Sequence, residues 1–92
     1  MKWPEATEWH DGKRIQFNFN NYIVSIVQFT GSYGYKQGLW EVYFIDRDTE
    51  TFCEPPLDFL TEYNNADVGI YGYLNDPEVD RIVQAMEKLD AN

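Results

Sequence analysis

The chain has 92 residues, a formal net charge of −9 and an aromatic fraction of 17%. We interpret it as one domain, residues 1–92, which buries only about 60–65% of its unfolded surface and needs large aromatic side chains to fill its core. It has no apolar run of roughly 18 residues and no apolar signal-peptide core, which argues against a membrane span and predicts a cytoplasmic protein. The single cysteine, Cys53, cannot form an internal disulfide and agrees with a reducing compartment.

The negative charge is concentrated in the second half of the chain. Residues 1–40 carry four cations and three anions, whereas residues 41–92 carry three cations and thirteen anions. Such an acidic domain repels phosphate backbones, which argues against direct nucleic-acid binding, and it associates readily with basic surfaces. The alternative interpretation is that the charge only keeps an aromatic-rich chain soluble.

The first part of the chain predicts an irregular segment followed by a hairpin. Residues 1–13 show no clear period but contain two tryptophans, so we expect them to lie over the domain with at least one indole buried. Residues 14–20 alternate apolar and polar side chains, as a half-buried strand does. Asn20-Asn21 favours a tight turn, because asparagine tolerates left-handed backbone angles, and residues 22–29 form the returning strand.

Residues 39–46 (LWEVYFID) are the most strand-like run, because nearly all are apolar, aromatic or β-branched. Glu41 alone interrupts the apolar character, which predicts a central strand covered on both faces. Residues 50–54 predict a short fourth strand that ends at Pro55-Pro56, since proline has no N–H to donate to a ladder. The expected sheet is therefore a four-stranded antiparallel β-meander.

Residues 57–74 are ambiguous, with a helical turn expected near Leu57 and a short extended segment after Gly69. The C-terminal pattern is clearer. Asn75 or Asp76 caps a helix over residues 77–90, with Glu78 placed as in a capping box. Its apolar residues form one stripe, made of Val79, Ile82, Val83, Met86 and Leu89. One amphipathic α-helix packed on an antiparallel sheet predicts an α+β domain.

The sequence offers no recognisable catalytic, cofactor or metal site. His10 and Cys53 could form a catalytic or metal-binding pair only if the fold joined an irregular segment to the end of a strand. Residues 46–50 (DRDTE) resemble the start of a calcium loop, but Thr51 and Leu57 stand where such a loop needs glycine and glutamate. The glycines of residues 31–38 match no phosphate-binding pattern. We therefore expect no enzyme activity, no cofactor and no metal.

Several sequence blocks resemble small uncharacterised proteins encoded by tailed bacteriophages and prophages. The blocks are YIVSIV at 22–27, GSYG at 31–34, GLWEV at 38–42, GYL at 72–74 and PEV at 77–79. The resemblance spans roughly residues 20–89, and the N-terminal WPEATEWH segment departs from it. It implies an accessory protein made in an infected bacterial cytoplasm, and it assigns no catalytic or binding residue.

Two surfaces are candidates for protein binding. The first is the nine-residue loop 30–38, with Tyr33, Tyr35 and Lys36. The second is the acidic surface of the second half, which comprises the acidic turn with Asp46, Asp48 and Glu50 together with Glu54, Asp58, Glu62, Asp67, Asp76, Glu78 and Asp80. We expect a non-enzymatic module that engages a basic surface of a host protein, as an anti-defence or DNA-mimicking inhibitor does. A structural or assembly protein that self-associates through an aromatic patch, as a homodimer, is the alternative. The simpler interpretations are that a tyrosine folds onto the core and that the acidic face is only solvated.

Overall fold

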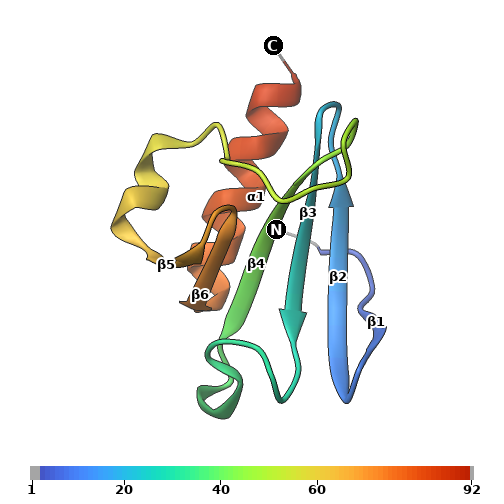
Figure 1. The fold of residues 1–92 in the computed structure, drawn as a ribbon, viewed down its shortest axis with the longest axis vertical. Helices are drawn as coiled ribbons and strands as arrows, with labels where there is room; N and C mark the ends of the chain where they lie inside the picture. The colour runs from blue at the N-terminus through green and yellow to red at the C-terminus, as the bar shows by residue number, and fades with distance from the viewer. Residues whose placement is uncertain (1–2, 92) are drawn as a thin grey trace.

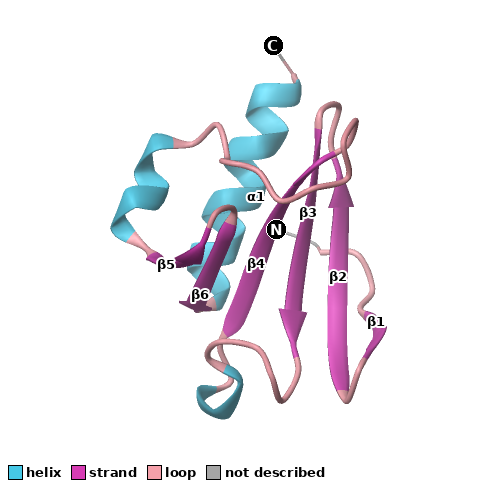
Figure 2. Cartoon of the chain, viewed as in Figure 1, coloured by secondary structure: helices cyan, strands magenta, loops and turns pink. Residues whose placement is uncertain are grey.

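A computed structural model, which describes residues 3–91, shows an α+β architecture in which one helix packs against an antiparallel sheet (Figures 1 and 2). The sheet has six strands in the order β1-β2-β3-β4-β6-β5. The strands are β1 (Thr7–Trp9), β2 (Gly12–Asn18), β3 (Tyr22–Gln28), β4 (Trp40–Asp46), β5 (Asn64–Asp67) and β6 (Ile70–Leu74). The helices are the short 3-10 helices η1 (Tyr35–Gln37) and η2 (Asp58–Glu62), and α1 (Asp76–Asp90). None of the helices within residues 3–91 is long and apolar enough to cross a membrane.

The three central strands confirm the predicted antiparallel order. β3 pairs antiparallel with β2 on one side and with β4 on the other, so that Ile26 lies opposite both Ile15 and Val42. The turn between β2 and β3 closes at Asn20-Asn21, where the Phe19 N–H donates to the Tyr22 carbonyl at 2.8 Å. Neither asparagine has a positive φ, so this turn forms without the left-handed backbone that motivated its prediction.

The predicted four-stranded meander is wrong at its fourth strand. Residues 50–54 make only one bridge to β4, between Phe52 and Ile45. The remaining edge of β4 pairs with β6, and between these contacts the Phe44 N–H donates to the Gly69 carbonyl at 2.7 Å. Because Pro55-Pro56 cannot continue a ladder, the chain leaves the sheet and a later segment takes its place.

The ambiguous segment 57–74 contains both predicted features and one that was missed. The helical turn is η2, where Leu60 is 1% exposed, and the extended segment is β6. The missed element is β5, which pairs with β6 at the edge of the sheet. All four β5 residues are exposed, so they show no apolar alternation that a pattern could detect.

The N-terminal segment is more regular than its sequence indicates. Residues 7–9 form β1, which corrects the expectation of an irregular 1–13; residues 1–2 lie outside the described part of the chain. Both indoles are half-buried. The Trp3 indole N–H donates to the Asp80 carboxylate on α1, and the Arg14 guanidinium lies 4.6 Å from the Trp9 ring centroid. Side-chain contacts across the domain, rather than local periodicity, thus hold this segment.

Helix α1 confirms the predicted cap. The Glu78 N–H donates to Asn75 Oδ1 and the Asn75 N–H donates to Glu78 Oε1, both at 2.9 Å, which is a reciprocal capping box. Of the predicted apolar stripe, four residues are buried against the sheet, but Leu89 is 43% exposed. The stripe therefore ends one turn before the helix does.

The sheet face opposite α1, called the open face here, has no helix packed over it within residues 3–91, and Figure 1 views it with α1 behind β4 and β6. Ser25, Val27 and Glu41 on this face are nevertheless buried. Side chains and loops provide the cover. The Phe52 ring lies 5.5 Å from the Tyr43 ring, and Arg14 Nε donates to Ser25 Oγ at 2.8 Å.

Candidate functional site

The two predicted binding surfaces lie at opposite ends of β4. Loop 30–38, with Tyr33, Tyr35 and Lys36, leads into the start of β4 at Trp40, whereas the acidic turn follows its end at Asp46 (Figure 1). Because β4 separates loop 30–38 from the acidic turn, we consider them as two separate candidate sites.

The acidic turn uses one of its carboxylates structurally. Asp46 Oδ1 accepts hydrogen bonds from the backbone N–H groups of Asp48, at 2.8 Å, and Thr49, at 3.2 Å. Aspartate commonly stabilises a turn in this way. The carboxylates of Asp48 and Glu50 accept no hydrogen bond from residues 3–91 and remain on the surface. Of the three acidic residues predicted in this turn, these two are the ones available to a partner.

Loop 30–38 has a defined conformation. Gly34 and Gly38 both have left-handed backbone, with φ of 95° and 71°, and flank the short helix η1. Ser32 Oγ accepts from the Phe29 N–H at 3.0 Å, which closes the start of the loop. Tyr33 then rests against Gly72 of β6, where an added Cβ would come within 2.5 Å of the Tyr33 Cβ. Glycine at position 72 is thus what lets the loop approach the sheet.

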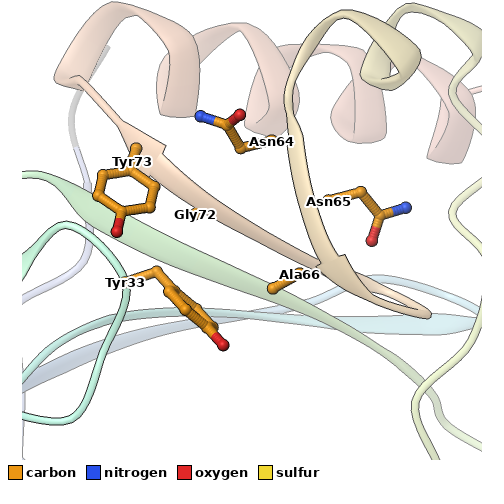
Figure 3. A pocket seen from close by; sticks show the side chains of 6 residues that line it. All are labelled: Tyr33, Asn64, Asn65, Ala66, Gly72 and Tyr73. Carbon is orange, nitrogen blue, oxygen red and sulfur yellow. The ribbon is translucent and has the colours of Figure 1, made fainter.

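Tyr33 and Tyr73 border a shallow surface depression, called the tyrosine hollow here (Figure 3). Their ring centroids are 6.2 Å apart, and the side chains are 49% and 44% exposed. The hollow has a volume of about 260 Å³ and is lined by Tyr33, Asn64, Asn65, Ala66, Gly72 and Tyr73. Exposed tyrosines beside small and amide side chains are typical of protein-binding surfaces.

A second depression, called the acidic hollow here, lies between η2 and the β5–β6 hairpin. Its volume is about 310 Å³, and its lining includes the carboxylate residues Glu54 and Asp58. Leu60 and Tyr71 form its floor and belong to the core shared with α1, so this hollow opens on the helix side of the sheet. Asn65 lines both hollows, which places β5 between them.

Sequence reasoning named some residues of this site and missed others. Tyr33 was predicted from its loop, and Glu54, Asp58 and Asp67 were predicted as part of the acidic surface, whereas Tyr73 and the β5 residues Asn64, Asn65 and Ala66 were not. Tyr35 is 39% exposed and Lys36 is exposed beside it, but both face a separate depression shared with Tyr73. The only sequence signal was that Tyr73 is an aromatic residue in the predicted extended segment; its exposure and its left-handed φ of 59° are seen only in the structure.

Glu41 is the only buried carboxylate residue within residues 3–91, at 4% exposure, and lies beneath Tyr33 on the open face. It accepts a hydrogen bond from the Tyr43 hydroxyl at 3.1 Å. Burial raises the pKa of Glu41 above its ordinary value, and the hydrogen bond from Tyr43 only partly offsets this. Burial, together with the neighbouring Glu41 charge, also raises the pKa of Tyr43.

We expect Glu41→Gln to raise the free energy of unfolding at about pH 7. Because the folded pKa of Glu41 is raised, the folded state holds this proton to a higher pH than the unfolded chain does. Stability is therefore lost as pH rises through the folded pKa, and an uncharged amide avoids that loss. The gain should shrink toward about pH 3, where the Glu41 carboxyl is largely protonated in both the folded and the unfolded state.

Denaturant titration of both proteins across this pH range measures the effect. Glu8→Gln is the matched control, because it removes one negative charge from an exposed position on β1. If the control gains as much stability as Glu41→Gln, general charge repulsion rather than burial of Glu41 explains the result.

The residues considered for catalysis or metal binding do not come together. His10 lies in the exposed turn between β1 and β2, whereas Cys53 follows the bridge near the other end of β4. Burial raises the pKa of the Cys53 thiol, and the Asp46 and Glu54 charges add to this, so the reactive thiolate is disfavoured. Residues 3–91 contain no group of three or more metal-binding side chains.

Comparison of the chain with protein-family models, with curated proteins and with solved structures gave no match.

Proposed function

We propose that this chain is a non-enzymatic protein-binding module that engages a basic surface of a partner protein. The observation that carries the proposal is the pair of hollows on either side of β5, one bordered by the exposed tyrosines Tyr33 and Tyr73 and the other by Glu54 and Asp58, which form no ion pair within residues 3–91. Tyrosine contributes large contact area at interfaces, and unpaired carboxylates attract lysine and arginine.

The anions divide into those with a structural partner and those without. Within residues 3–91 the one ion pair joins Glu62 to Arg81 at 3.2 Å. Several other carboxylates accept hydrogen bonds from the protein itself, namely those of Asp11, Glu41, Asp46, Asp67, Asp76, Glu78, Asp80 and Asp90. Of the seven carboxylates with no such partner there, four lie together in the connection between β4 and β5, namely those of Asp48, Glu50, Glu54 and Asp58, whereas those of Glu5, Glu8 and Glu87 lie outside it. This connection is therefore the best-supported contact for a basic partner.

The proposed setting follows from the resemblance to proteins of tailed bacteriophages. We propose that the partner is a host protein in the cytoplasm of an infected bacterium, and that binding inhibits it in the manner of an anti-defence protein or DNA mimic. A basic surface that normally holds phosphates would accept the carboxylates of the 48–58 connection. The chain itself would not bind nucleic acid directly.

Self-association through an aromatic patch is a second candidate. It is favoured by exposed large side chains outside loop 30–38, namely Phe52 (51%), which packs against Tyr43 on the open face, Val68 (49%) and Tyr73 (44%). Sedimentation at micromolar concentration separates the two candidates, because a monomer contradicts self-assembly and a stable dimer supports it.

We expect capture of a partner from bacterial lysate to fall steeply as salt rises, since a Debye length of about 8–10 Å at 0.1–0.15 M salt screens exposed charges. Reversing the exposed acids should also reduce capture while the fold is retained. Two double variants locate the contact: Asp48→Lys with Glu50→Lys, and Glu54→Lys with Asp58→Lys. Asp46 is left unchanged because it stabilises the turn. Affinity purification at several salt concentrations, with mass spectrometry of the bound protein, measures the outcome.

The matched control is Glu5→Lys with Glu87→Lys, which changes net charge equally at exposed positions outside the 48–58 connection. Capture that is indifferent to salt and to both test variants would contradict the proposal. The loop substitutions Tyr33→Ala and Tyr35→Ala would then be the next to make.

A further inference from the structure

Strand β5 ends the sheet, and one side of its backbone has no neighbouring strand from residues 3–91. All four residues, from Asn64 to Asp67, are exposed. An unpaired strand edge is a template for another strand, and proteins commonly block it with lysine, proline, a bulge or a short strand. β5 has neither lysine nor proline. Its short length and the bulge between Asn65 and Asp67 limit an added strand to a few residues.

The two hollows lie on opposite sides of this edge. Asn64 is paired with Gly72, which faces Tyr33. Asn65 is paired with Tyr71, whose ring centroid lies 5.9 Å from that of Phe44 in the core. Figure 3 shows the Asn65 side chain pointing away from those of Asn64 and Ala66. Successive side chains of a strand added to β5 would alternate in the same way. One would reach the tyrosine hollow and the next the acidic hollow.

The negative charge around β5 favours a basic segment of another protein over a second copy of this chain as the added strand. The acidic hollow has Glu54 and Asp58 on its rim, and the edge itself ends at Asp67. A second copy of this chain, paired edge to edge through β5, would bring these carboxylates against their own copies, and like charges at short range oppose association. A basic segment of a different protein relieves this repulsion.

We propose that the outer edge of β5 accepts an extended segment of a partner protein as an added strand, in which basic side chains enter the acidic hollow and apolar ones enter the tyrosine hollow. This inference rests on the proposed function and specifies its partner. Main-chain hydrogen bonds would supply affinity, and the alternation of basic and apolar residues would supply specificity.

The test uses a capped peptide of about eight residues with alternating lysine and valine, a length typical of strands. Two matched peptides accompany it, one with glutamate in place of lysine and one N-methylated on alternate amides. We expect the lysine peptide alone to bind, with shifts and slowed exchange of the amide signals of residues 64–67. The Glu54→Lys, Asp58→Lys variant should lower affinity about tenfold, because two attractions become repulsions. The Asp48→Lys, Glu50→Lys variant should lower it less than about twofold.

Four results would overturn this inference. Equal binding of the N-methylated peptide would show adsorption by charge without strand pairing. Amide shifts confined to residues outside 64–74, or no peptide binding while a lysate partner is still captured by its salt-sensitive contact, would leave the proposed function standing without this edge. A dimer that protects the amides of residues 64–67 would show that a second copy occupies the edge.

Discussion

Ile82→Asp should leave the chain unfolded at about 25 °C. Ile82 is fully buried in α1, among the core residues that join the helix to β4. The substitution removes an apolar side chain from the core and places a carboxylate there with no cation beside it. The combined cost is about 5 kcal/mol or more, against a total stability of roughly 5–10 kcal/mol for a domain of this size. Circular dichroism and amide NMR spectra measure the loss of structure.

Gln84→Asp is the matched control, since Gln84 is exposed on the same helix. It introduces an aspartate two residues further along the same helix. It therefore has the same cost of low helix propensity as Ile82→Asp, but no cost of burying a charge. This control should remain folded. A native-like melting transition for Ile82→Asp would show that α1 is not docked on the sheet as described.

The sequence predicts those parts of the fold in which the type of each residue depends on whether its own side chain is buried or exposed. The alternation at 14–20 and the stripe from Val79 to Met86 exist because one side of each element is buried. The capping box is equally local, since Asn75 and Glu78 satisfy each other's backbone. Strands β2, β3, β4 and helix α1 were therefore predicted close to their observed bounds.

The parts that could not be predicted depend on partners distant in sequence. β5 carries no apolar alternation, and it is a strand only because β6 lies beside it. Residues 50–54 carry strand-forming side chains, but β6 takes the position that this segment would have occupied. The same limit holds for the candidate site. Tyr33 was predicted from a long loop, whereas its contact with Gly72 and its neighbour Tyr73 arise only when the loop folds onto β6.

Gly69→Ala should destabilise the chain strongly, because Gly69 lies where three segments meet. Its φ of 72° is unfavourable for a residue with a Cβ. An added Cβ would also come within 2.4 Å of the Cys53 carbonyl oxygen and 3.0 Å of the Phe44 carbonyl oxygen. Both contacts are with backbone, which cannot move aside without separating β4 from the segments that pair with it. We expect a loss of about 3–5 kcal/mol in the free energy of unfolding.

Gly38→Ala is a closely matched control for this prediction. Gly38 has nearly the same φ, 71°, but a Cβ there would meet no atom within 4 Å. Gly38→Ala should therefore lower the free energy of unfolding only by the cost of a left-handed backbone at alanine, about 1–2 kcal/mol. Urea denaturation of the two variants measures both losses, and their difference isolates the crowding at Gly69. Equal losses would contradict the arrangement in which the β5–β6 hairpin, Cys53 and Phe44 meet.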